Sequence, residues 1–128
     1  MEKVKIKRID CTYKSIIYHN CFCYNNFNGV PIDYFYSYLS SGEIEKLEKF
    51  KTEKHKKSFS IGRYVAKTAA NFLVGKNSYD DISIDNGVLN NPILVAQTFH
   101  NIQISISHCE DFAAAVAARI PLPAAAAA

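Results

Sequence analysis

The stretch NIQISISHCEDFAAAVAA, residues 101–118, constrains the fold most. Ile102, Ile104 and Ile106 fall on one side of an extended chain and the polar residues between them on the other, which is the pattern of a half-buried strand. His108 follows where that strand ends, a place where proteins often display binding groups. The run FAAAVAA is ambiguous, because alanine favours a helix but the segment is short and follows a strand and a turn.

The longest helical pattern is KHKKSFSIGRYVAKTAANFLVG, residues 54–75, in which apolar side chains recur every three or four positions. Gly62 lies inside this pattern, where a glycine costs about 1 kcal/mol relative to alanine. A glycine at such a place indicates that another backbone or a ligand comes close. A shorter helix precedes this one, with Ser40 or Ser41 as its cap and acidic residues in its first turn.

Four further segments have the pattern of strands: residues 3–9, 15–24, 81–84 and 91–96, the third of them followed by an expected turn at residues 85–87. The order along the chain is therefore strands, then two helices, then strands. Because the strands and helices are grouped rather than alternating, the order predicts an α+β fold.

Length and composition exclude several classes of protein. The chain has 128 residues, which suits one domain with its own core. It has no apolar run of 18 residues, so we expect no membrane span, and the N-terminal MEKVKIKRID does not read as a signal peptide. Four cysteines, at positions 11, 21, 23 and 109, have no spacing that predicts a zinc site or a disulfide framework. We expect reduced thiols and a cytoplasmic location.

Basic charge is concentrated in residues 43–67, which hold eight basic and four acidic residues, against seven basic and eight acidic residues elsewhere. Such a segment is either a solvated helix face or a site for an anion, such as a nucleotide, a phosphate group or an acidic partner. Aromatic residues do not interleave with the basic run as a stacking platform for bases would, so we expect no nucleic acid partner.

Four blocks between about residues 39 and 118 together resemble the 4'-phosphopantetheinyl transferases of the surfactin-synthetase-activating type. ISISHCEDFAAAVA resembles the family's strand that ends in a Ser-His pair and is followed by a strand of small residues. LSSGEIEKLEKFK resembles the family's helix with a basic face, and KKSFSIGRYVAKTAANFL its helix with a basic residue ahead of Gly-Arg. NGVLNNPIL resembles the family's glycine turn before a proline.

The resemblance implies a small antiparallel sheet packed against a long helix, forming one half of a pseudo-dimer of two such units. We assign residues 1–123 to the N-terminal half and treat the alanines at 124–128 as artefactual or unidentified residues. The family's Mg2+-binding carboxylates should fall at about residues 123–127, where the sequence has none. We therefore expect no catalytic or metal-binding residue in this chain, magnesium ligands in a missing part, and no activity of the 128-residue chain alone.

The implied activity is Mg2+-dependent transfer of the 4'-phosphopantetheine arm of coenzyme A to a serine of an apo acyl or peptidyl carrier protein. Its partners would be coenzyme A, the carrier protein and the second half of the same fold. The alternative is a non-catalytic module that binds a nucleotide or a carrier protein. The coenzyme A-binding candidates implied by the resemblance are Lys46, Lys57, Arg63, Asn91, Ser107 and His108.

Each candidate also has a structural interpretation. His108, which with Lys57 would hold the 3'-phosphate of coenzyme A, is otherwise a strand-end histidine with local hydrogen bonds. Ser107 is otherwise a turn-capping serine, and Arg63 a structural partner of a carboxylate. Lys46 and Lys57 are otherwise solvated surface lysines. Asn91 stands where many relatives carry lysine or glutamine before the proline; it can still donate a hydrogen bond but lacks the charge of a lysine.

Overall fold

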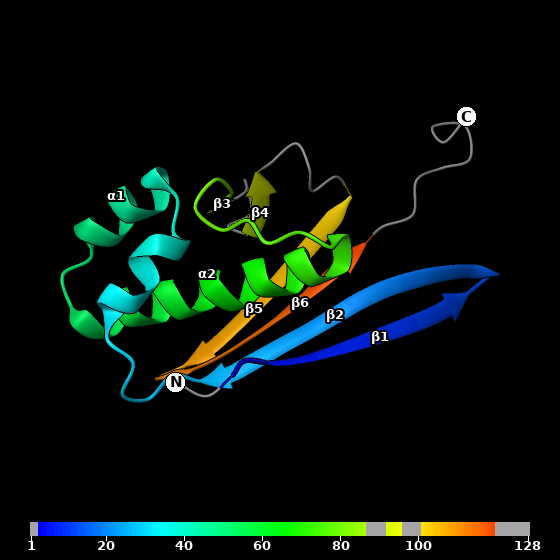
Figure 1. Ribbon diagram of the computed structural model, residues 1–128, viewed down its shortest axis with the longest axis horizontal. Helices are drawn as coiled ribbons and strands as arrows, with labels where there is room; N and C mark the ends of the chain where they lie inside the picture. Colours follow the sequence, from blue (N-terminus) through cyan, green and yellow to red (C-terminus); the bar gives the residue numbers. More distant parts are fainter. Residues whose placement is uncertain (1–2, 87–91, 96–100, 120–128) are drawn as a thin grey trace.

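The computed structural model describes residues 3–86, 92–95 and 101–119 (Figure 1). Strands come first along the chain, then helices, then strands again, as predicted. The elements are β1 (Lys5–Tyr13), β2 (Ile16–Asn26), a 3-10 helix η1 (Ile32–Tyr38), α1 (Ser41–Lys49), α2 (Glu53–Val74), β3 (Ser83–Asn86), β4 (Pro92–Val95), β5 (Ile102–Cys109) and β6 (Phe112–Arg119).

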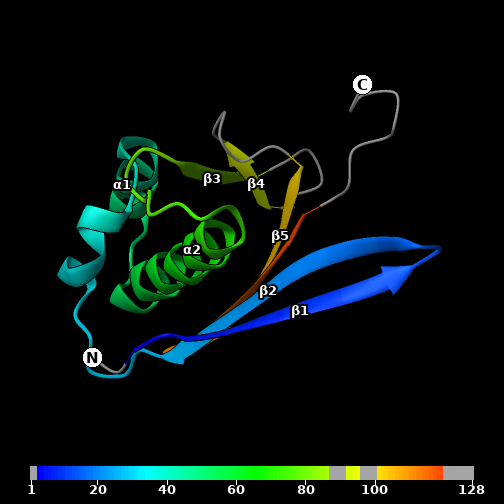
Figure 2. The same cartoon turned by 45° about the vertical axis from the view of Figure 1, so that its right-hand side comes forward.

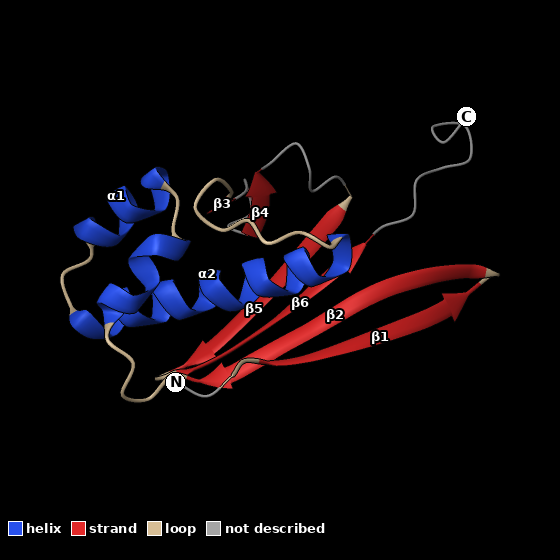
Figure 3. Cartoon of the chain, in the orientation of Figure 1, coloured by secondary structure: helices blue, strands red, loops and turns tan. Residues whose placement is uncertain are grey.

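The strands form one antiparallel sheet in the order β1-β2-β6-β5 and a separate ladder of β3 with β4 (Figure 3). The ambiguous run FAAAVAA lies in β6, which pairs with β2 on one side and with β5 on the other. Because this central strand has its backbone groups bonded on both sides, pairing outweighs the helix preference of alanine. The predicted α+β class with a small antiparallel sheet is confirmed.

The long helix α2 lies across one face of the sheet (Figures 1 and 2). Beneath it are alternate small residues of the two central strands: Cys21, Cys23, Ala113, Ala115 and Ala117, all buried. The two cysteines share a face of β2, because side chains two positions apart on a strand point to the same side. Burial raises the pKa of the Cys23 thiol to about 12, so this thiol stays protonated at neutral pH.

Gly62 is where α2 comes close to β5. A Cβ atom added to it would lie 3.1 Å from Cγ2 of Ile106. The predicted close approach is confirmed, but the neighbour is a side chain of the sheet and not a backbone or a ligand. The missing side chain therefore allows the end of β5 to stand close to α2, which matters for the site described below.

Both α-helices begin at a residue whose side chain caps the first turn. Of the two candidate caps of α1, Ser40 is confirmed, and it forms a capping box with Glu43. Thr52 caps α2 through the backbone N–H of His55, and Gly75 ends α2 with a φ of 69°, the left-handed conformation that glycine adopts freely. Among the described residues, no helix has the length and apolar character needed to cross a membrane.

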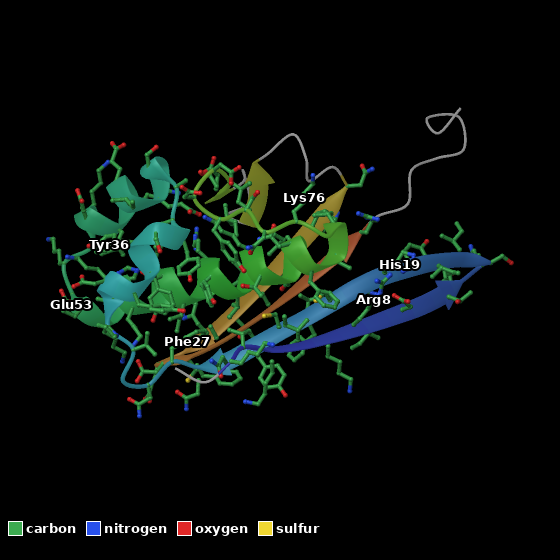
Figure 4. The ribbon with its side chains drawn as sticks, viewed as in Figure 1. Arg8, His19, Phe27, Tyr36, Glu53 and Lys76 are labelled. Carbon is green, nitrogen blue, oxygen red and sulfur yellow. The ribbon has the colours of Figure 1, made fainter. Side chains whose placement is uncertain are left out.

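The β1–β2 hairpin extends beyond the end of α2 (Figures 1 and 2). Arg8 and His19 lie on this hairpin (Figure 4), and the carboxylate of Asp10 contacts both of them, at 3.3 and 3.0 Å. The hydrogen bond with His19 holds the pKa of the Asp10 carboxyl below its ordinary value. The hairpin thus carries its own exposed polar cluster, away from the buried contacts between sheet and helix.

Candidate functional site

A pocket of about 500 Å³ is formed by α1, the first turns of α2 and the end of β5. Its lining residues are Lys46, Lys49, Phe50, His55, Ser58, Phe59, Arg63 and His108. This set, which we call the basic pocket, contains lysines, an arginine and histidines but no carboxylate. Cationic and imidazole groups from three separate elements therefore converge on one hollow, an arrangement that favours an anion.

His108 reaches the basic pocket because of the register of β5. It pairs with Ala113 of β6 and continues the side of the strand on which Ile104 and Ile106 pack into the core. Because side chains alternate along a strand, Ser107 lies on the opposite face of the sheet, where it is exposed. The Ser-His pair is thus divided, and of the two residues only His108 lines the pocket.

Arg63 forms the partly buried side of the basic pocket. Its guanidinium carbon lies 4.2 Å from the centre of the Phe59 ring, and Nη2 donates to the backbone oxygen of Ile84 at 3.3 Å. No ion pair joins it to a carboxylate among the described residues, and its buried Nε has no hydrogen-bond partner there. Burial lowers the pKa of Arg63, while the more distant charges of Glu43 and Asp85 raise it. The side chain thus carries a partly desolvated positive charge that an anion could stabilise.

Aromatic rings form the apolar part of the pocket. The ring of Phe50 stacks on that of His55, with centres 3.9 Å apart and planes 25° apart, and meets Phe59 edge-on at 5.2 Å. Sequence reasoning did not assign His55, Phe50 or Phe59 to the site. The spacing of His55, Phe59 and Arg63, four residues apart along α2, places them on one helix face and could have indicated the first two.

Lys57 lies in a second hollow, of about 630 Å³, which we call the acidic hollow. It is lined by Val30, Pro31, Ile32, Asp33, Glu53, Lys54, Lys57, Glu110 and Asp111. Lys57 Nζ donates to the backbone oxygen of Val30 at 2.6 Å and lies 3.5 Å from Oδ1 of Asp111. The structure therefore brings Lys46, Arg63 and His108 together but separates Lys57 from them.

Two predictions from sequence remain, one about Asn91 and one about magnesium ligands. Asn91 lies outside the described residues. Within the described residues, no three His, Cys, Asp or Glu side chains gather where they could hold a metal ion.

Comparison with known proteins identifies the family. No family model matches the chain. Holo-[acyl-carrier-protein] synthases from Bacillus cereus (strain B4264) and Bacillus thuringiensis (strain Al Hakam) are each 31% identical to it over 93 residues, covering 60% of this chain and 78% of the relative. The crystal structure of a holo-(acyl-carrier-protein) synthase from Bacillus anthracis str. Ames, in complex with CoA (3',5'-ADP), matches 90% of this chain and 92% of that chain with a TM-score of 0.60 at 23% identity.

These matches confirm the predicted superfamily and the predicted fold class. They also show that a unit of this size makes up most of a relative's chain, since each relative is covered over 78% of its length. The chain belongs to the holo-[acyl-carrier-protein] synthase family, within the phosphopantetheinyl transferase superfamily.

Proposed function

We propose that this protein transfers the 4'-phosphopantetheine arm of coenzyme A to a serine of an apo carrier protein, and that the basic pocket binds the 3'-phosphate of coenzyme A. One observation carries the second part. Lys46, Arg63 and His108 come from three separate blocks of sequence, and the fold brings all three to one pocket that has no carboxylate in its lining. Family membership supports the first part.

The chemistry requires anchoring more than it requires a reactive protein group. The serine oxygen of the carrier protein attacks the β-phosphate of coenzyme A, the bond to the departing phosphate oxygen breaks, and 3',5'-ADP leaves while the serine loses its proton. Arg63 and His108 can donate charge-assisted hydrogen bonds to a phosphate, and the lysines add positive charge at the rim. Holding the nucleotide end in place lets binding energy align the β-phosphate for attack.

We also propose that the transfer requires Mg2+, and the resemblance to the family is the sole support for this part. Mg2+ would neutralise charge on the pyrophosphate through oxygen ligands. The described side chains provide no cluster for it, so no step of the reaction is assigned to a metal-bound group here. Removing divalent ions with EDTA should abolish transfer and added Mg2+ should restore it, whereas transfer that is unaffected by EDTA would contradict this part.

We also propose that a second unit of the same fold completes the site, from the same polypeptide or from another copy, with residues 1–123 forming one unit. If another copy is needed, the transfer rate per chain should rise with protein concentration and level off when association is complete. A rate per chain that is constant from nanomolar to micromolar concentration, in a protein that sediments as a monomer, would oppose assembly from copies. A cytoplasmic location is part of the proposal as well, and the four free cysteines support it.

The proposed function is tested by incubating the 128-residue chain with coenzyme A, Mg2+ and apo acyl or peptidyl carrier proteins. At protein concentrations where two units associate, intact-mass spectrometry of the carrier should show the added phosphopantetheine arm, whereas we expect a single isolated 128-residue unit to be inactive. Coenzyme A binding without transfer to any carrier, at any protein concentration, would instead support the non-catalytic binding module. If the chain neither binds coenzyme A nor transfers the arm, both the transferase and the binding-module functions are excluded.

A further inference from the structure

Glu43 is a buried carboxylate on which three parts of the chain meet. It lies in the first turn of α1 and is 1% exposed. Oε1 accepts hydrogen bonds from the backbone N–H of Ser40 at 2.9 Å and from Nζ of Lys67 at 2.5 Å. Oε2 accepts from the backbone N–H of Ile84 at 2.9 Å. One side chain therefore ties the start of α1 to the middle of α2 and to β3.

Lys67 is fully buried, and its contacts leave it no capacity to bind a ligand. Besides Glu43, its ammonium donates to the backbone oxygens of Tyr38 and Tyr79, at 2.9 and 2.8 Å. An ammonium group has three N–H donors, and all three are used. Burial lowers the pKa of Lys67, and the neighbouring charge of Glu43 offsets this only in part. The pair cannot contact a ligand, and any effect on the site must pass through its neighbours.

The neighbours of Glu43 reach the basic pocket along two routes. The peptide N–H of Ile84 is held by Glu43, and the backbone oxygen of the same residue accepts from Arg63, which lines the pocket. Lys46, which also lines the pocket, lies three residues after Glu43 on α1 and so projects from the same side of that helix. Fixing Glu43 therefore fixes both the acceptor that orients Arg63 and the rotation of α1 that aims Lys46.

We propose that Glu43 is a positioning residue of the basic pocket, acting through β3 on Arg63 and through α1 on Lys46. This inference rests on the proposed function, because it takes the pocket to be the site of the 3'-phosphate. For removal of the Glu43 carboxylate, positioning and charge alone predict opposite changes in the affinity for coenzyme A. Removing a carboxylate near an anion site should strengthen anion binding by electrostatics, whereas loss of positioning should weaken it.

The test compares Glu43→Gln with Glu48→Gln, the same charge change at an exposed position of α1. Titration calorimetry measures the affinities of coenzyme A and of dephospho-coenzyme A, which lacks only the 3'-phosphate, at a temperature where circular dichroism shows each variant folded. For Glu43→Gln we expect coenzyme A to bind about tenfold more weakly, as when one hydrogen bond to a charged group is lost, with dephospho-coenzyme A little changed. For Glu48→Gln we expect wild-type affinities.

Glu43→Asp provides a second variant if the glutamine variant does not fold. It keeps the charge that Lys67 needs but is shorter, so it cannot hold Lys67 and Ile84 together, and we expect a folded protein with a reduced preference for coenzyme A. A wild-type preference in a folded Glu43→Gln or Glu43→Asp protein would overturn the inference, and so would failure of both to fold, because Glu43 would then serve folding only. Equal binding of the two ligands by the wild-type protein would instead overturn the proposed function.

Discussion

The basic pocket and the acidic hollow lie against different faces of the same helix and differ in charge. Both draw residues from the basic segment 43–67. The basic pocket has no carboxylate in its lining, whereas the acidic hollow has four, from Asp33, Glu53, Glu110 and Asp111, with only two lysines. The charge of a segment therefore does not locate an anion site, because the helix distributes its side chains between two surfaces with different neighbours.

The two hollows also differ in how their cations are engaged. Lys57 of the acidic hollow already bonds to a backbone oxygen and lies beside Asp111. Among the described residues, Arg63 of the basic pocket has one backbone acceptor and one aromatic ring as partners, and its Nε has no hydrogen-bond partner. Substitutions should therefore affect ligand binding on one side of α2 and stability on the other.

The largest effect is expected for Arg63→Met, which removes the partly buried cation but keeps an apolar side chain against Phe59. Coenzyme A affinity should fall by roughly 10- to 150-fold, the equivalent of about 1.5–3 kcal/mol for a hydrogen bond to a charged group, with a much smaller change for dephospho-coenzyme A. Titration calorimetry with both ligands measures this. Arg63→Lys keeps the charge without the planar donor group, so its affinity for coenzyme A should lie between those of the wild-type protein and of Arg63→Met. An unchanged affinity for coenzyme A would remove Arg63 from the site.

His108→Ala should weaken coenzyme A binding by about tenfold, at the lower end of the same range, because the side chain is exposed at the end of β5. Dephospho-coenzyme A should be affected much less. The matched control is Ser107→Ala, one residue earlier on the opposite face of the sheet, which should leave both affinities unchanged. Equal losses for both ligands on His108→Ala, together with a lower melting temperature, would show that the histidine is structural.

Lys46→Ala and Lys49→Ala should each weaken coenzyme A binding by only a few-fold, since each is a lysine at the rim of the pocket and water screens its charge. Raising the salt concentration from 50 to 500 mM should remove most of the difference from wild type. A loss that persists at high salt would show that the lysine makes a desolvated contact with the ligand.

The smallest effect on binding is expected for Lys57→Met. The substitution removes the contacts with Val30 and Asp111, so the free energy of unfolding should fall by about 1 kcal/mol. The ratio of the two ligand affinities should not change, because Lys57 does not line the basic pocket. If Lys57→Met reduced the preference for coenzyme A over dephospho-coenzyme A as much as His108→Ala does, the ligand would have to reach both hollows. That result would support the prediction from sequence that Lys57 and His108 together hold the 3'-phosphate.

Much of the fold could be predicted because it depends on local sequence. The alternation around Ile104 gives β5, and the periodicity of residues 54–75 gives α2, with Ser40 and Gly75 at helix ends. The strand β6 could not be assigned from its own residues, since a run of alanines becomes a strand only when two partners take up its hydrogen bonds.

The site was predicted in part for a related reason. Lys46, Arg63 and His108 were found as residue types in recognisable blocks, and the structure brings them together. Lys57 is two positions from both His55 and Phe59, which is about half a turn of helix, and so it faces away from them. Packing between distant segments decides which face of α2 meets the end of β5. Neither the sequence of α2 nor that of β5 alone predicts this packing.

The central claim is that the basic pocket recognises the 3'-phosphate of coenzyme A, and titration of the wild-type chain with coenzyme A and dephospho-coenzyme A tests it most directly. At 50 mM salt we expect the Kd for coenzyme A to be lower by about tenfold or more, because one charge-assisted phosphate contact is worth at least this much. The difference should narrow as salt is raised. Equal Kd values for the two ligands at low salt would contradict the claim.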